Sequence, residues 1–203
     1  MKGKLPDGRT KQWKYLQRRR GFGLAGRQST RVETNDAIEV CHLADPSATD
    51  ALGRRLASQL IAAGAGDGAL LLLRGDLGTG KTSLVQGLAA ALGIAEPISS
   101  PTFALAQHYD TDAGPDAGAA ALVHLDLYRL EQAAAADELF AQEEEEARRI
   151  GAVMAVEWPE RLSFQPEGAW EVALSHLEDG EGRLARITPP GFTPPRSWPA
   201  APR

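Results

Sequence analysis

Eight consecutive residues, Gly75-Asp76-Leu77-Gly78-Thr79-Gly80-Lys81-Thr82, have the types and spacing of a phosphate-binding loop. They fit the pattern G-x-x-x-x-G-K-[ST], in which glycines let successive backbone N–H groups turn toward a polyphosphate. The lysine ammonium would reach the β- and γ-phosphates, and the threonine hydroxyl would bind Mg²⁺. The pattern therefore predicts that the chain binds ATP and Mg²⁺ through Asp76, Leu77, Gly78, Thr79, Gly80, Lys81, Thr82 and the neighbouring Ser83.

Lysine usage in the rest of the chain supports a specific role for Lys81. After Lys14 it is the only lysine, whereas arginine occurs 11 times from residue 32 onward. A compact ammonium fits among phosphate oxygens where the planar guanidinium fork does not. We therefore assign Lys81 a catalytic as well as a binding role.

Two carboxylates lie where predicted strands end. Asp126 belongs to the apolar stretch 122–127, and Glu157 follows the apolar stretch 152–156. In open α/β sheets, ligands bind at the carboxyl ends of the strands. A Mg²⁺ held by Thr82 needs a further carboxylate, and a water that attacks the γ-phosphate needs an orienting acceptor. We assign Asp126 to the metal, and Glu157 to the water or to the metal; each could instead be a solvated residue at a strand end.

Three other features near these residues have two interpretations each. His124 shares a strand face with Asp126, but a lone imidazole is more often a hydrogen-bonded core residue than a catalyst. Trp158 could stack on a base or pack under the loop, and packing is favoured. The segment 99–103 is either a proline-bearing turn or a switch loop in which the Thr102 hydroxyl senses the γ-phosphate or Mg²⁺. Its spacing alone favours the turn.

The elements that must position these residues follow from hydrophobic periodicity. Predicted strands cover residues 37–42, 70–73, 103–109, 122–127, 152–156, 170–177 and 183–187; predicted helices follow Pro46, follow Lys81 as far as Gly93, and cover 131–149. Strands that alternate with helices and end in a hairpin indicate an α/β fold. We expect a P-loop NTPase three-layer sandwich with a mostly parallel central sheet and a C-terminal antiparallel hairpin.

Charge divides the 203-residue chain into a body and two ends. Residues 1–31 hold ten of the 22 Lys and Arg and one of the 27 Asp and Glu, so residues 1–33 are predicted to be a disordered basic extension. That extension could be a solvated tail, a weak contact for RNA or an acidic partner, or the product of a start codon chosen too far upstream. Residues 34–188 form the predicted ATPase domain, and the proline-rich residues 189–203 an extended tail.

Composition also excludes several classes of protein. An acidic body binds nucleic acid poorly, so we expect no DNA partner, and a connection to RNA that is either indirect or made by the basic extension. The chain has no apolar run long enough for a membrane span and no secretory signal, which predicts a cytoplasmic protein without a membrane partner. Cys41 is the only cysteine and is expected to be buried, so no intramolecular disulfide can form.

Four motifs in this order resemble the bacterial TsaE (YjeE) family, the ATPase of tRNA threonylcarbamoyladenosine synthesis. They are residues 75–82, Ser100-Pro101-Thr102-Phe103, His124-Leu125-Asp126-Leu127-Tyr128-Arg129 and Glu157-Trp158-Pro159-Glu160-Arg161-Leu162. The resemblance covers about residues 36–188. It implies that Thr82 and Asp126 bind Mg²⁺, that Glu157 acts in hydrolysis, that Trp158 lies by the nucleotide, and that 100–103 forms a switch loop containing Thr102.

The same resemblance implies the partners. The chain would work with the proteins TsaD and TsaB, which make N6-threonylcarbamoyladenosine in tRNA. Its ATP hydrolysis would support their turnover, and it would contact tRNA only indirectly through that complex.

Two other functions remain open at the level of sequence. A P-loop small-molecule kinase would need an arginine-bearing lid, yet only Arg129 lies between Asp126 and Arg148. A nucleotide-gated adaptor would dock on a partner in its ATP form with little hydrolysis. A GTPase is disfavoured, because base recognition by an N-K-x-D element needs a lysine that does not occur after Lys81.

Overall fold

The computed structural model describes residues 33–35, 38–63, 68–111, 121–177 and 182–192. Most of the predicted basic extension, most of the predicted proline-rich tail and residues 112–120, between the predicted strands 103–109 and 122–127, lie outside the described residues. The elements in chain order are β1 (Glu33–Asn35), β2 (Ile38–Leu43), α1 (Pro46–Ala63), β3 (Ala69–Arg74), α2 (Lys81–Ala91), β4 (Ala106–Tyr109), β5 (Leu122–Asp126), α3 (Ala133–Ile150), β6 (Val153–Glu157), the 3₁₀ helix η2 (Pro159–Arg161), β7 (Trp170–His176) and β8 (Arg183–Thr188). Among them, no helix is long and apolar enough to cross a membrane.

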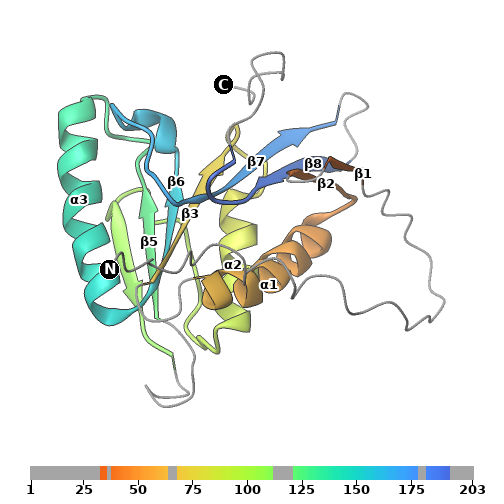
Figure 1. The fold of residues 1–203 in the computed structure, drawn as a ribbon, viewed down its shortest axis with the longest axis horizontal. Helices are drawn as coiled ribbons and strands as arrows, with labels where there is room; N and C mark the ends of the chain where they lie inside the picture. Colours follow the sequence, from red (N-terminus) through yellow and green to blue (C-terminus); the bar gives the residue numbers. More distant parts are fainter. Residues whose placement is uncertain (1–32, 36–37, 64–67, 112–120, 178–181, 193–203) are drawn as a thin grey trace, which may run out of the picture.

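The eight described strands form one mixed sheet in the order β1-β2-β8-β7-β3-β6-β5-β4 (Figure 1). Only the four central strands, β7-β3-β6-β5, pair in parallel; the four outer pairings are antiparallel. The expected α/β fold with a C-terminal hairpin is confirmed, but the expectation of a mostly parallel sheet is wrong. Parallel neighbours need a long crossover connection, whereas only residues 110–121 separate β4 from β5 and only residues 177–182 separate β7 from β8, and both of these pairs are antiparallel.

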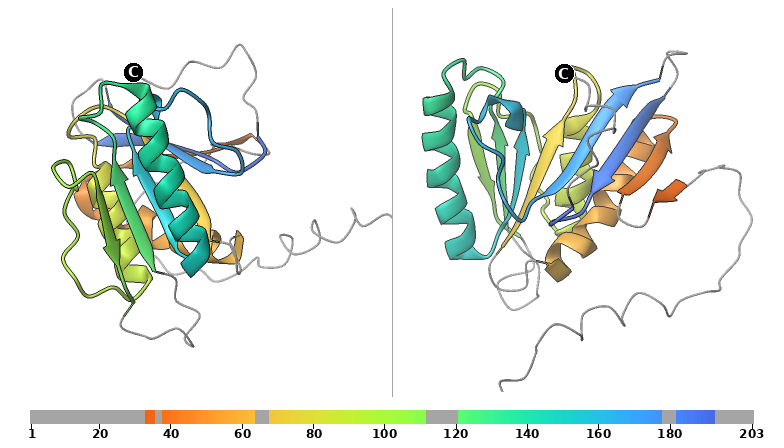
Figure 2. Two further views of the ribbon diagram at one scale, coloured as in Figure 1. Left: turned by 90° about the vertical axis from the view of Figure 1, so that its left-hand side faces the viewer. Right: turned by 45° about the horizontal axis from the view of Figure 1, so that its top comes forward.

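Helices cover both faces of the sheet (Figures 1 and 2). On one face, α1 and α2 bury leucines such as Leu56, Leu60, Leu84 and Leu88 against β3 and β7. On the other, α3 packs Ala136, Phe140 and Ala147 against β5 and β6. These positions repeat at helical spacing, which is why α3 is amphipathic. Its run of glutamates does not face solvent throughout, because Glu143 is buried and its Oε2 lies 2.6 Å from His108 Nε2 of β4.

The helix that follows the Gly75–Thr82 loop is locked against α1 by two glycines. A Cβ on Gly53 would lie 2.0 Å from the Leu84 carbonyl oxygen, and one on Gly87 would lie 2.0 Å from the Asp50 carbonyl oxygen. Only glycine permits backbones to approach so closely. This contact sets the direction of α2 and therefore of its N-terminus.

Three local features differ from the sequence-based expectations. Strand β4 begins at Ala106 rather than at residue 103, because Leu105 has φ 68° and ends a turn in which its N–H donates to the Pro101 carbonyl oxygen. Strand β1 and the helix η2 were not predicted. Glu157 is the last residue of β6 rather than the residue after it, since it pairs with Leu73 of β3 on one side and Asp126 of β5 on the other.

Candidate functional site

The Gly75–Thr82 loop joins the end of β3 to the start of α2. Three of its glycines have positive φ: Gly75 133°, Gly78 81° and Gly80 101°. A Cβ on Gly75 would also lie 2.3 Å from the Leu174 carbonyl oxygen. This position therefore requires glycine both for its positive φ and for lack of space. Gly80 caps α2 without a side-chain hydrogen bond, and the first turn of α2 holds no acidic residue. The positive end of the helix dipole and its free N–H groups therefore remain available to an anion.

Lys81 is folded into this loop. Its Nζ donates to the Gly75 carbonyl oxygen at 2.6 Å and to the Asp76 carbonyl oxygen at 3.0 Å, and the residue is only 4% exposed. Burial lowers the pKa of Lys81, and the carboxylates of Glu157, Glu160, Asp126 and Asp76 oppose that shift. The ammonium is thus a buried cation held by two backbone carbonyl groups of the loop. A phosphate bound by the loop would lie close to it.

Glu157 accepts hydrogen bonds from two directions. The Thr82 hydroxyl donates to its Oε1 at 2.9 Å, and His124 Nε2 lies 3.1 Å from the same oxygen. Glu157 is 3% exposed and His124 is completely buried. The prediction that His124 is a hydrogen-bonded core residue is confirmed, and its partner is a predicted catalytic carboxylate.

Asp126 is held by the segment that was predicted as a turn or a switch loop. Its Oδ2 accepts from the hydroxyls of Ser100 and Thr102, each at 2.6 Å, and its Oδ1 accepts from the Tyr128 N–H at 3.0 Å. Thr102 therefore contacts a predicted metal ligand directly. Sequence reasoning noticed Ser100 only as part of the segment, because nothing in the local pattern shows that both hydroxyls turn toward β5.

Trp158 forms one wall beside the lysine. It has φ 61°, an unusual value for a bulky residue, and its ring lies 4.1 Å from Lys81 Nζ and 4.9 Å from the Tyr128 ring. The prediction that Trp158 packs next to the loop agrees with these contacts. Tyr128 was not singled out as a site residue, although it follows Asp126 by two positions.

Arg183 of β8 reaches the loop from outside. Its Nη2 donates to the Gly78 carbonyl oxygen at 3.4 Å, and its Nε lies 3.5 Å from where a Cβ of Gly80 would be. The two partners are 105 residues apart in sequence. No sequence signal links them, so sequence reasoning missed this contact.

Thr82, Asp126 and Glu157 are the residues of this site that could hold a Mg²⁺ ion. Within the described residues, no group of three or more His, Cys, Asp or Glu is placed to hold a metal ion. Thr82 contacts Glu157, and Asp126 pairs with Glu157 across adjacent strands, so one hydroxyl and two carboxylates meet at this edge of the sheet. Mg²⁺ keeps several waters and takes only one or two carboxylates in phosphate sites, which this set can supply.

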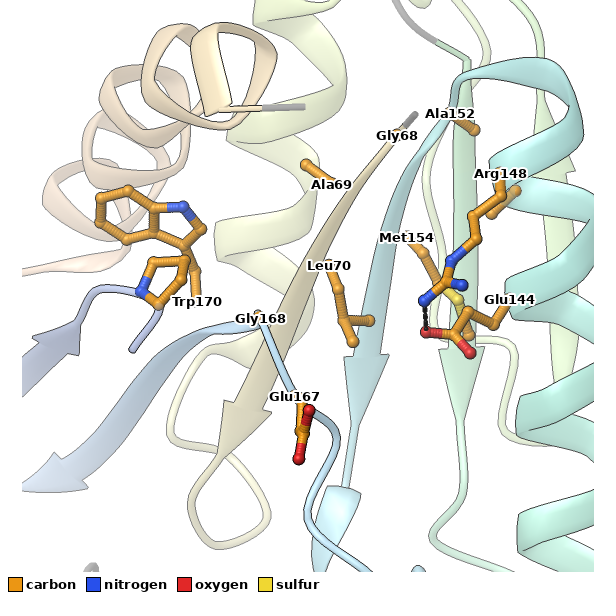
Figure 3. Close-up of a pocket in the computed structure, with 12 residues that line it drawn as sticks. Gly68, Ala69, Leu70, Glu144, Arg148, Ala152, Met154, Glu167, Gly168 and Trp170 are labelled. Carbon is orange, nitrogen blue, oxygen red and sulfur yellow. Dashed lines mark hydrogen bonds and ion pairs between the residues drawn. The ribbon is translucent and has the colours of Figure 1, made fainter. Parts of the chain in front are cut away.

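A separate cavity of about 650 Å³ lies at the opposite edge of the central strands (Figure 3). It is lined by Leu70 and Met154 from the sheet, by the ion-paired Glu144 and Arg148 of α3, and by Glu167. No residue of the predicted site lines it. The candidate site is instead a backbone loop with buried charges, which needs no deep apolar hollow.

Comparison with known proteins gives a consistent result. The model of the family described as "Threonylcarbamoyl adenosine biosynthesis protein TsaE" matches residues 43–185. A protein of Nostoc sp. named tRNA threonylcarbamoyladenosine biosynthesis protein TsaE is 40% identical over 156 residues, which cover 77% of this chain and 89% of that protein. The protein of the same name from Synechocystis sp. is 44% identical over 126 residues, or 61% of this chain and 72% of that one.

A solved structure is also similar. The crystal structure of Bacillus subtilis YdiB matches with a TM-score of 0.54 and 27% identity, covering 80% of this chain and 90% of that chain.

Proposed function

The chain belongs to the TsaE family, and we propose on that basis that it is a P-loop ATPase that binds and hydrolyses ATP with Mg²⁺. The observation that carries the proposal is the loop of positive-φ glycines that encloses the Lys81 ammonium at the N-terminus of α2, where no side chain caps the helix. Helices on both faces of a sheet with four parallel central strands support the interpretation as a three-layer P-loop NTPase fold, with residues 34–188 as its ATPase domain.

Different residues would bind the nucleotide, hold Mg²⁺ and orient the attacking water. Backbone N–H groups of residues 76–83 surround the phosphates, and Lys81 leaves its carbonyl partners to neutralise the β- and γ-phosphate charge. Glu157 orients the attacking water, and Trp158 forms the wall beside the nucleotide. Mg²⁺, held by Thr82 and Asp126 with help from Glu157, would neutralise negative charge on the phosphate oxygens.

Thr102 is the proposed sensor of this site. Its hydroxyl donates to Asp126 Oδ2, so a change in what Asp126 binds would alter the position of residues 100–103. Phe103 is 86% exposed, and the Arg129 guanidinium lies 4.1 Å from the centre of its ring. Residues 100–103 can therefore transmit the state of the metal site to the protein surface as a switch loop.

We further propose that ATP hydrolysis by this chain supports turnover of a TsaD and TsaB complex that makes N6-threonylcarbamoyladenosine in tRNA. The relatives named for threonylcarbamoyladenosine biosynthesis support this role. The chain would act in the cytoplasm. It would contact tRNA only through the complex, because the body of the chain is acidic and repels phosphate.

A pair of assays tests the proposal. Calorimetric titration with ATP and Mg²⁺ should give saturable binding, and phosphate release should be slow for the chain alone and faster with TsaD and TsaB. The variant Thr82→Ala should fold and bind nucleotide but lose Mg²⁺-dependent hydrolysis, because it lacks the hydroxyl metal ligand. Absence of ATP binding at millimolar nucleotide, or equal hydrolysis by Thr82→Ala and the parent, would contradict the proposal.

Two alternatives have distinct outcomes in the same assays. A small-molecule kinase would transfer the γ-phosphate to an added metabolite rather than to water. A nucleotide-gated adaptor would bind its partners only with ATP and release little phosphate in their presence. If the chain is such an adaptor, Glu157→Gln should leave its partner binding and its function intact.

A further inference from the structure

His124 is a buried titratable residue that the proposed mechanism does not use. It lies on β5 with no exposed surface, two residues before Asp126. Its Nε2 is 3.1 Å from Oε1 of Glu157, the carboxylate oxygen that also accepts the Thr82 hydroxyl. A histidine placed this close to a proposed catalytic group calls for a physical explanation.

The strand register explains how the contact arises. His124 pairs with Ala155 of β6, and Asp126 pairs with Glu157. Paired and alternate residues face the same side of the sheet, so the three polar side chains share one face with the small side chain of Ala155. The imidazole can therefore extend over Ala155 toward Glu157.

The hydrogen-bonding capacity of the two groups determines which atom donates. An ionised carboxylate only accepts, so Nε2 must carry the proton. Within the described residues, the buried Nδ1 has no hydrogen-bond partner. A neutral imidazole protonated on Nε2 leaves only a lone pair without a partner on Nδ1. A second proton, on Nδ1, would leave a buried N–H without an acceptor.

The distribution of donors over Glu157 is unequal. Oε1 is bonded by Thr82 and contacted by His124, while none of the residues that the structure describes donates a hydrogen bond to Oε2. The proposed function needs the Thr82 hydroxyl for Mg²⁺. When Thr82 turns to the metal, His124 is the donor that still holds Oε1.

We infer that His124 is a positioning residue for Glu157, which fixes the carboxylate through Oε1 so that Oε2 remains free for the attacking water. This inference rests on the proposed function. In this role His124 acts only through Glu157. The rotational freedom of an unheld carboxylate would reduce the fraction of molecules in which Glu157 is correctly oriented.

The test compares two amide variants of similar polarity. In His124→Gln the side-chain nitrogen can occupy the place of Nε2, whereas in His124→Asn it lies nearer the place of Nδ1 and cannot reach Glu157. We expect His124→Asn to lower kcat by about 10- to 100-fold, the usual cost of removing a residue that orients a catalytic group, with an unchanged ATP dissociation constant. His124→Gln should recover most of that loss, and thermal unfolding of both variants verifies that they fold.

A double variant separates positioning from a general effect on the core. In the Glu157→Gln background, His124→Asn should cause no further loss of kcat, because the group it positions no longer functions. Full activity of His124→Asn, an equal loss for both amide variants, or an added loss on top of Glu157→Gln would each overturn the inference. Those results leave the proposed function intact, whereas a parent protein that neither binds nor hydrolyses ATP overturns both.

Discussion

At the carboxyl edge of β3, β5 and β6, five polar residues are buried: Thr79, Lys81, His124, Asp126 and Glu157. At the amino edge of β3 and β6, Leu70, Met154 and neighbouring alanines line a cavity of about 650 Å³, and the Glu144–Arg148 ion pair lies at its rim (Figure 3). The edge that contains this cavity is therefore not the edge that carries the buried polar residues. Phosphate recognition depends on oriented backbone dipoles and a buried cation rather than on cavity volume.

The difference also has an energetic side. A buried polar group destabilises the fold unless it is hydrogen-bonded, and each of these five has at least one partner. The ion pair at the amino edge is partly solvated, with 66% of the Arg148 side chain and 27% of the Glu144 side chain exposed. Substitutions at the two edges should therefore differ in kind, and the following predictions test that contrast from the largest expected effect to the smallest.

Removing the loop cation should have the largest effect. Lys81→Ala is expected to abolish measurable ATP binding, because the truncation leaves phosphate charge uncompensated at a cost of about 2–5 kcal/mol. Calorimetric titration measures the loss. The matched control is Arg148→Ala, which removes a cation at the amino edge and should leave ATP affinity unchanged; equal effects of the two substitutions would remove the distinction between the edges.

Neutralising Glu157, the proposed catalytic carboxylate, should lower the rate of ATP hydrolysis and leave ATP binding unchanged. Glu157→Gln is expected to lower kcat for ATP hydrolysis by about 100-fold or more, because an amide cannot accept the proton of the attacking water. The ATP dissociation constant should change little. Glu144→Gln provides the control at the amino edge, and a normal kcat in Glu157→Gln would show that Glu157 is only a structural acceptor for Thr82 and His124.

Substitution of two glycines with positive φ, one at each edge, compares how much each edge contributes to the free energy of unfolding. Gly75→Ala places a Cβ 2.3 Å from the Leu174 carbonyl oxygen, whereas Gly151→Ala meets no atom within 4 Å. Gly151→Ala should therefore cost only the backbone strain of about 1–2 kcal/mol, and Gly75→Ala should cost more. Chemical denaturation of both variants measures the difference, and a Gly75→Ala protein as stable as Gly151→Ala would show that the loop can relax.

The smallest effect is expected at the exposed ion pair. Glu144→Gln removes one partner of Arg148 in a pair at i,i+4 spacing and should change the free energy of unfolding by about 0.5 kcal/mol or less. Thermal denaturation measures this change. A loss of several kcal/mol would mean that the amino edge, like the carboxyl edge, depends on its charges.

Much of the site could be predicted from the sequence. Residues 75–82 were predicted to be a phosphate-binding loop, and the acids of β5 and β6 were chosen because ligands of open α/β sheets bind at the carboxyl ends of the strands. Thr102 and Trp158 were considered, with the turn and packing interpretations favoured on spacing. The structure places Thr102 on Asp126 and Trp158 on Lys81, whereas the roles proposed for these residues in hydrolysis remain predictions.

The rest could not be predicted because it depends on pairings between distant segments. Strands β4 and β5 lie antiparallel, and β8 places Arg183 against Gly78. Neither arrangement leaves a periodic signal in the sequence. The mostly parallel sheet was expected from alternating strands and helices, and that rule does not apply where only a short segment separates two consecutive strands.

The sequence by itself determined the loop that we propose binds the phosphates, since glycines, a lysine and a threonine within eight residues specify positive φ values, an ammonium and a hydroxyl at one helix N-terminus. Only the tertiary structure decided which groups hold Glu157 and Asp126. Thr82 and Glu157 are 75 residues apart, and His124 and Glu157 are 33 residues apart. Those contacts exist because β6 lies between β3 and β5, and strand order is a property of the packed sheet rather than of any local segment.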